Sequence, residues 1–245
     1  MEILGIDIGG SGIKSAPVNL ETGALTRSRH KILTPQPSTP EAVAGVVVEL
    51  VEHFQWEGPI GCTLPTVVRR GVVHSAANID KSWIGVDGER LLRKATGHPV
   101  TLLNDADAAG IAEMRFGAGR DRRGVVFILT FGTGIGSGVF VDGHLHPNTE
   151  LGHLEFKGMH AEHYAAARVR EAEKLTYKKW GTRVDEFLEH LEDIFSPDLF
   201  IIGGGVSRKM EKFQAYLVLD TEVVPAQLRN EAGIIGAALT ARDRL

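Results

Sequence analysis

Residues 2–18 read EILGIDIGGSGIKSAPV, which is two apolar runs joined by a short glycine-rich turn. The runs at 2–8 and 13–18 are rich in β-branched and apolar residues, so both predict buried strands. The turn contains Gly9, Gly10, Ser11 and Gly12, which let the backbone approach a ligand closely. The stretch therefore predicts a β-hairpin that can offer backbone N–H groups to an anion.

The second half of the sequence begins in the same way. A strand-like run at 125–131 enters a glycine turn and leaves it as a second apolar run at 137–141. The turn contributes four candidate phosphate-binding residues: Gly132, Thr133, Gly134 and Gly136. Neither turn has the P-loop or the dinucleotide-binding pattern. The repetition indicates an internal duplication.

A third glycine turn lies at 203–205. Gly203, Gly204 and Gly205 follow a strand-like run at 199–202 and precede Val206-Ser207. Such a turn can border the base of a nucleotide or simply start a helix. We treat it as a candidate for the distal end of a phosphate donor.

The remaining pattern alternates helices with short strands. Helical periodicity covers 41–54, 105–116, 161–175, 182–194 and a closing segment from about 230, and strand-like runs cover 26–33, 60–64 and 100–104. Residues 65–99 read as a loop-rich stretch. A hairpin followed by a helix and strands therefore occurs twice, which predicts an α/β fold of two halves with the first two glycine turns at one cleft.

Composition excludes several classes of protein. The chain has 245 residues, 43% of them hydrophobic and 24% charged, with a net charge of −4, so no global field favours nucleic acid or an anionic membrane. The single Cys62 excludes a disulfide framework and a thiolate-rich zinc site, and it fits a reducing cytosol. The N-terminal apolar run is too short to span a membrane. We expect a cytoplasmic protein.

Two acidic positions beside the strands are candidates for chemistry. Asp7 precedes the first glycine turn, where a carboxylate would repel phosphate unless a cation mediates, so Asp7 is either an Mg²⁺ ligand through water or a solvated side chain. Asn104-Asp105 ends one strand and begins a helix. Asp105 is therefore either an N-cap or a general base that takes a proton from an attacking alcohol, and Asn104 can bind the same hydroxyls.

The run TELGHLE at 149–155 supplies Glu150, His153 and Glu155, and Glu162 follows in AEHYAA. Carboxylates suit the paired hydroxyls of a sugar, and an imidazole can add a further hydrogen bond. The same residue types also bind metals. Because the spacing is not HExxH, we favour sugar binding here.

Five motifs, DIGGSGIK, NDADAAG at 104–110, LTFGTGIGSG at 129–138, TELGHLE and IIGGGVS at 201–207, resemble the ROK sugar-kinase family, within the superfamily of sugar kinases, Hsp70 and actin. The resemblance runs from end to end. Longer stretches, SAANIDKSWIG at 75–85, PNTELGHLE at 147–155 and NEAGIIGAAL at 230–239, are similar to the polyphosphate glucokinases of that family, including those that also accept ATP or mannose.

The resemblance implies a role for each candidate residue. Asp105 would be the general base on the 6-hydroxyl of glucose, and the other sugar hydroxyls would be bound by Asn78, Asn104, Glu150, His153 and Glu162, with Glu155 close by. Donor phosphates would lie on the first two glycine turns and Lys14, with Mg²⁺ near Asp7. KGMHAEHYA at 157–165 contains no Cys, so no structural zinc is implied.

The resemblance also implies two actin-like lobes of the ribonuclease H-like type with a cleft between them. The smaller would span 1–104 with a C-terminal helix at 231–245 packed back on it, and the larger would span 105–230. Relatives are commonly homodimers. Two alternatives stay open, a strictly ATP-dependent hexokinase of the same family and a sugar sensor without activity. The clusters Arg120, Arg122, Arg123 and Lys174, Lys178, Lys179, Arg183 either are solvated surface or steer a polyanionic donor.

Overall fold

The computed structural model describes residues 1–77 and 79–242, and its contacts divide the chain into two compact units. Unit 1 contains Met1–Ala112 and the C-terminal segment from Glu231, and unit 2 contains Glu113–Asn230. The division falls within helix α3 (Asp105–Phe116), whereas the sequence suggested a boundary at 104/105. The functional division into lobes 1–104 and 105–230 stays a prediction.

Unit 1 is built on a five-stranded sheet. Across the sheet its strands are β3 (His30–Ile32), β2 (Ile13–Asn19), β1 (Glu2–Ile8), β4 (Ile60–Leu64) and β7 (Val100–Asn104). β1 pairs antiparallel with β2 and parallel with β4, and β4 pairs parallel with β7. The remaining elements are α1 (Pro40–Phe54), β5 (Val68–Arg69), β6 (Val72–Val73), η1 (Lys81–Trp83), α2 (Gly88–Thr96) and α7 (Ala232–Arg242).

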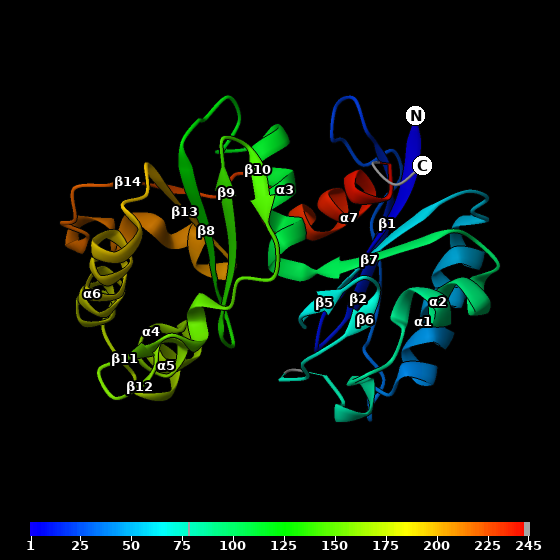
Figure 1. Cartoon of the computed structure of the whole chain (residues 1–245), viewed down its shortest axis with the longest axis horizontal. Helices are drawn as coiled ribbons and strands as arrows, with labels where there is room; N and C mark the ends of the chain where they lie inside the picture. Colours follow the sequence, from blue (N-terminus) through cyan, green and yellow to red (C-terminus); the bar gives the residue numbers. More distant parts are fainter. Residues whose placement is uncertain (78, 243–245) are drawn as a thin grey trace. The chain divides into compact units, whose positions relative to one another are not determined.

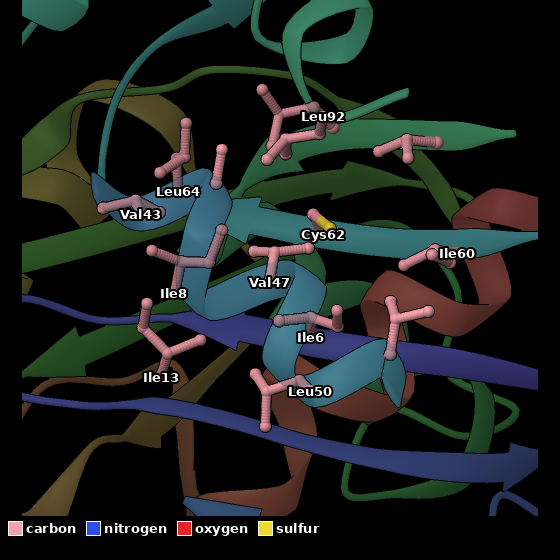
Figure 2. Packing of buried hydrophobic residues seen from close by; sticks show 14 of the residues in the cluster. Ile6, Ile8, Ile13, Val43, Val47, Leu50, Ile60, Cys62, Leu64 and Leu92 are labelled. Carbon is pink, nitrogen blue, oxygen red and sulfur yellow. The ribbon is translucent and has the colours of Figure 1, made fainter. Parts of the chain in front are cut away.

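One face of this sheet is covered by α1 and α2. Helix α1 begins at Thr39, whose side chain accepts a hydrogen bond from the N–H of Ala42, and Pro40 fits the first turn because it needs no hydrogen-bond acceptor. Its buried face packs on β1, β2 and β4, and Figure 2 shows this core with Ile6, Ile8, Ile13, Val43, Val47, Leu50, Ile60, Cys62, Leu64 and Leu92. Burial raises the pKa of the Cys62 thiol well above its ordinary value, so this side chain is an inert part of the core.

The opposite face of the sheet is covered by α7, which approaches backbone to backbone. Any side chain at Gly5 would collide with the carbonyl of Ile234, and any side chain at Gly61 would collide with the carbonyl of Ala237. Gly236 allows α7 the same close approach to α3. All but the first two residues of NEAGIIGAAL therefore fold as part of a small-residue helix that lies directly on β1 and β4.

Unit 2 repeats the architecture of unit 1. Across its sheet the strands are β10 (His144–His146), β9 (Ile135–Val141), β8 (Val125–Phe131), β13 (Leu199–Gly203) and β14 (Glu222–Pro225). β8 pairs antiparallel with β9 and parallel with β13, as β1 does with β2 and β4. The expected internal duplication is thus confirmed, and each sheet can be followed in Figure 1.

The other elements of unit 2 are mostly short helices. They are η2 (Leu151–His153), β11 (Glu155–Phe156), β12 (Met159–His160), α4 (Ala161–Ala165), α5 (Ala167–Ala172), α6 (Tyr177–Phe195), η3 (Gly205–Lys212) and η4 (Gln214–Tyr216), and η5 (Arg229–Glu231) leads back to unit 1. The core lies between the sheet and α6, where Trp180, Phe187 and Phe213 are fully buried. The Nε1–H of Trp180 donates to the carbonyl of Ala165, which joins α6 to α4.

Several sequence-based boundaries need correction. The expected strand at 26–33 is reduced to His30–Ile32, and the expected helix at 161–175 is broken at Ala166, whose backbone is extended. α2 and β14 were missed, and α6 begins earlier than expected because Thr176 caps it. The closing helix ends at Arg242 within the described residues. None of the helices described here is both long enough and apolar enough to cross a membrane.

Candidate active site

The first glycine turn connects β1 to β2 in unit 1. The antiparallel register pairs Ile8 with Ile13 and leaves Gly9–Gly12 as the turn, in which the N–H of Gly9 donates to the carbonyl of Gly12 over 3.2 Å. The carbonyl of Gly9 accepts a hydrogen bond from the hydroxyl of Thr34. The structure therefore has the hairpin that the sequence predicted.

Asp7 is held at the base of this turn by side chains from two strands. Lys14 lies opposite Asp7 in the β1–β2 register, and its Nζ donates to Oδ2 over 3.1 Å. The hydroxyl of Thr63 on β4 donates to Oδ1, also over 3.1 Å. Gly233 in the first turn of α7 leaves room for the carboxylate, since a Cβ there would lie 2.9 Å from its Cγ.

Asn104 and Asp105 have different roles at the start of α3. Oδ1 of Asn104 accepts from the N–H groups of Ala106 and Asp107 over 2.8 and 3.0 Å, and its Nδ2 donates to the carbonyl of Thr66 over 3.0 Å. Asn104 is thus the N-cap. Asp105 is the first residue of the helix, with Oδ1 accepting from the N–H of Ala106 over 2.9 Å. The N-cap interpretation of Asp105 is therefore replaced by a cap at Asn104.

The second glycine turn connects β8 to β9 in unit 2, and one carboxylate lies against it. The N–H of Gly132 donates to the carbonyl of Gly134 over 2.9 Å. Oε2 of Glu162 accepts from the N–H of Ile135 over 3.3 Å, and any side chain at Gly134 would collide with this carboxylate. The turn and Glu162, which are far apart in the sequence, are therefore brought together.

Glu150, His153 and Glu162 form one cluster in unit 2. Nδ1 of His153 lies 3.7 Å from Oε2 of Glu150, and Nε2 lies 3.9 Å from Oε1 of Glu162. The imidazole is therefore flanked by two carboxylates, at distances too long for direct hydrogen bonds. The structure brings these three residues together, and their binding of a sugar stays a prediction.

Glu150 is the carboxylate of this cluster whose pKa is shifted by partial loss of hydration. Burial raises the pKa of the Glu150 carboxyl, His153 lowers it and the nearby Glu162 raises it, with a net upward shift. Hydrogen-bond donors such as sugar hydroxyls would replace the lost hydration. Glu155 differs from the other three, because it is exposed and lies opposite His160 in the small β11–β12 hairpin.

Helix α4, which carries Glu162, has only five residues and is tied to its surroundings by side chains. The hydroxyl of Tyr164 donates to Oε2 of Glu186 on α6 over 2.6 Å, and Lys157 donates to the same oxygen. Burial raises the pKa of Glu186, but the hydrogen bonds from Lys157 and Tyr164 outweigh it and hold the pKa below its usual value. These positioning residues were missed from the sequence, where nothing links Tyr164 to Glu186.

The third glycine turn begins with Gly203, the last residue of β13, and a cavity of about 570 Å³ is lined by residues that include Ser207, two positions after the turn. Gly203 pairs with Thr130 at the end of β8, and Gly204 has a φ of 78° and packs against the backbone of Phe131. Ser207 and the arginines Arg122 and Arg229 line the cavity. Arg122 also makes a bidentate ion pair with Glu222.

The candidate residues are divided between the two units. Asp7, Lys14, Asn104 and Asp105 belong to unit 1, whereas Gly132–Gly136, the third turn and the Glu150–His153–Glu162 cluster belong to unit 2. Asn78 lies outside the described residues. Within residues 1–77 and 79–242, no group of three or more His, Cys, Asp or Glu side chains has the geometry to hold a metal ion.

The chain is similar to known proteins along nearly all of its length. It is 54% identical over 96% of its length to a polyphosphate glucokinase from Mycobacterium tuberculosis, 89% of which is covered. The structure resembles that of an inorganic polyphosphate/ATP-glucomannokinase from Arthrobacter sp. strain KM, with a TM-score of 0.96 and 46% identity over 100% of this chain and 99% of that one. It also resembles a ROK family glucokinase from Streptomyces griseus, with a TM-score of 0.83 and 26% identity over 99% of this chain and 100% of that one.

The family model for the ROK family matches residues 3–165, which contain the first two glycine turns, Asp105 and the Glu150–His153–Glu162 cluster. This match covers more than half of the chain, and the long similarity to the M. tuberculosis protein agrees with it. The sequence motifs, the duplicated sheets and the comparisons thus lead to one conclusion: this chain belongs to the ROK family.

Proposed function

We propose that this chain is a polyphosphate-dependent glucokinase, which transfers the terminal phosphoryl group of inorganic polyphosphate to the 6-hydroxyl of glucose and releases glucose 6-phosphate. The observation that carries the proposal is the 54% identity, over 96% of the chain, to a polyphosphate glucokinase. Similarity to a polyphosphate/ATP-glucomannokinase supports ATP as a second donor and mannose as a second acceptor.

The sugar would be held by groups from both units. The carboxylates of Glu150 and Glu162 would accept hydrogen bonds from its hydroxyls, and His153 can accept or donate one. Asn104 can donate through the second hydrogen of its Nδ2. Asn78 would also bind a sugar hydroxyl, as the family resemblance implies. Each of these contacts positions the 6-hydroxyl, and positioning is a large part of what a phosphotransferase contributes.

Asp105 would act as the general base. It is anchored at the first position of α3, and the N-cap at Asn104 fixes the backbone on which it stands. Its carboxylate would accept the proton of the 6-hydroxyl as the sugar oxygen attacks the terminal phosphorus atom. The bond from that phosphorus to the bridging oxygen of the donor breaks, and the shortened polyphosphate leaves with the negative charge.

The donor phosphates would lie on the first two glycine turns, with the third turn and its cavity toward the distal end. Asp7 fits a water-mediated Mg²⁺ site, because Mg²⁺ commonly uses one carboxylate together with substrate phosphates, and here the ion would share the carboxylate with Lys14. When bound, Mg²⁺ offsets the charge of the donor. We propose that no structural zinc takes part, since 157–165 contains no Cys.

The family resemblance supports a homodimer as the working form. The single cysteine fits a reducing cytoplasm as its location. The same purified protein allows this to be tested by light scattering during size-exclusion chromatography. A mass of one chain at the concentration used for activity measurements would contradict the dimer.

The decisive experiment is the formation of glucose 6-phosphate by purified protein with glucose and Mg²⁺, with polyphosphate or ATP as the sole donor at equal phosphoryl concentration. We expect product with polyphosphate. Product with ATP alone would favour the strictly ATP-dependent hexokinase. Binding of glucose, seen as a higher melting temperature, without product from either donor would favour the sugar sensor.

A further inference from the structure

Lys31 extends across the first glycine turn from the neighbouring strand. β3 pairs antiparallel with β2, and the register places Lys31 opposite Lys14. The side chain of Lys31 occupies the space that a Cβ at residue 12 would need, and its Nζ lies 3.2 Å from that position. The absence of a side chain at Gly12 therefore lets a lysine ammonium rest against the turn.

The segment that follows Lys31 is fixed at both ends. The hydroxyl of Thr34 donates to the carbonyl of Gly9 in the turn itself. Farther along, Ser38 accepts from the N–H of Asp80 through its hydroxyl over 3.1 Å and from the Nε1–H of buried Trp83 through its carbonyl over 2.9 Å. The backbone that follows Lys31 is thus tied to the turn and to residues 80–83. These hydrogen bonds add to the pairing of β3 with β2 in fixing the position of the lysine.

The charges at the turn make Lys31 distinctive. Lys14 is engaged by Asp7 at 3.1 Å, so these two charges largely offset each other. No ion pair joins Lys31 to another residue within the part of the chain that the structure describes. Lys31 therefore supplies, beside Gly12, the positive charge that the Asp7–Lys14 pair does not.

We propose that Lys31 binds the terminal phosphates of the donor and is a specificity-determining residue for a polyanionic donor. This inference rests on the proposed function. An ammonium group has three donors and a compact charge, which suits the non-bridging oxygens of a phosphate chain. Lys31 would hold the donor and leave the general base and the sugar contacts unchanged.

An exposed lysine on an edge strand has another ordinary role, because a charge there discourages pairing with a second chain. β3 is an edge strand of its sheet, so this role predicts that removal of the charge affects association and leaves phosphate binding as it is. The two roles can be separated with variants that keep the aliphatic stem over Gly12.

The test is calorimetric titration of the full chain with inorganic tripolyphosphate, without glucose, for the wild type, Lys31→Met, Lys31→Arg and Lys94→Met. Met keeps the stem and removes the charge, and Lys94 is an exposed lysine of unit 1 on α2. We expect Lys31→Met to weaken binding about tenfold, as the loss of one charge-assisted contact implies, with Lys31→Arg and Lys94→Met close to wild type. The inference is overturned if the wild type does not bind tripolyphosphate or if Lys31→Met binds it as tightly as the wild type does. It is also overturned if Lys94→Met weakens binding as much as Lys31→Met does.

Kinetics of the same variants complete the test. Lys31→Met should raise the KM for polyphosphate by about tenfold, with kcat and the KM for glucose nearly unchanged, because the lost contact serves binding. A fall in kcat at unchanged KM would overturn the inference. Failure of the wild type to phosphorylate glucose would contradict the proposed function instead, and the titration, which needs no turnover, would still decide the role of Lys31.

Discussion

Asn104 caps helix α3 and Asp105 is the first residue of that helix, so the cap is supplied by the first of two adjacent polar side chains. The oxygen of Asn104 satisfies two backbone N–H groups that would otherwise lack partners at the helix start. The carboxylate of Asp105 is consequently not needed as the cap. This separation allows the two residues to be tested independently.

Asp105→Asn should abolish most of the turnover and leave the fold intact. Asparagine keeps the shape of the side chain and the oxygen that accepts from Ala106, but it cannot take a proton. We expect glucose 6-phosphate formation to fall by about 10²- to 10⁴-fold, the range for loss of a general base. Glucose should still raise the melting temperature. Near-normal turnover would reject Asp105 as the base.

Asn104→Ala should lower stability, because it removes the cap of α3 and the hydrogen bond to the carbonyl of Thr66. A lost cap costs about 1 kcal/mol, which urea unfolding can measure. Asn104→Asp is the matched control, since it keeps the capping oxygen and loses only the Nδ2 donor. If both variants unfold at the wild-type urea concentration, the cap does not contribute as argued here.

Glu150→Gln should raise the melting temperature at neutral pH while weakening glucose binding. Burial raises the pKa of Glu150 in the folded state, so the folded protein binds this proton more tightly than the unfolded chain does, and stability falls as pH rises through the folded pKa. Glutamine removes that penalty, and we expect a higher melting temperature than that of the wild type at pH 7.

The gain from Glu150→Gln should shrink as pH falls through the folded pKa and vanish below the unfolded pKa of about 4.5. Thermal melts across that range, together with the KM for glucose at neutral pH, check both effects. A variant with unchanged KM for glucose would remove Glu150 from the proposed sugar site, and a gain in stability that is independent of pH would contradict the electrostatic cause.

Gly61→Ala should destabilise unit 1, because an added methyl group would meet the carbonyl of Ala237 in α7 and force the helix away from β4. Overpacking costs about 1–3 kcal/mol, and a clash with backbone, which cannot move as a side chain can, places this variant toward the upper end. Gly45→Ala on the exposed side of α1 is the control, since nothing lies within 4 Å of its added methyl group. That variant should gain about 0.5–1 kcal/mol from helix propensity, and loss of stability in both would point to a cause other than the α7 contact.

The sequence predicted the parts of the fold that depend on local pattern. The runs at 60–64, 100–104 and 125–131 match β4, β7 and β8 because a buried strand in a parallel arrangement is a continuous apolar run with clear ends. Helix α2 was missed because its apolar residues are few and only Gly88 and Leu92 are buried. The strand expected at 26–33 was overextended, since only three of its residues pair with β2.

The candidate site was predictable in part for the same reason. Glu150 and His153 are neighbours in sequence and in space, and the motif alone connects them. The approach of Glu162 to the second glycine turn depends on the path of the chain through the β11–β12 hairpin and α4, which no local pattern specifies. Lys31 depends on strand register, since a shift by one residue would turn its side chain to the other face of the sheet.

The docking of α7 on β1 and β4 also sets an order of events during synthesis. The strands of unit 1 leave the ribosome first, yet the face that contains Gly5 and Gly61 stays uncovered until residues 232–242 have been translated. Unit 2, from Glu113 to Asn230, is complete before that point and can fold as a unit. The N-terminal sheet is therefore the last to be closed, and one of its faces stays uncovered throughout the synthesis of unit 2.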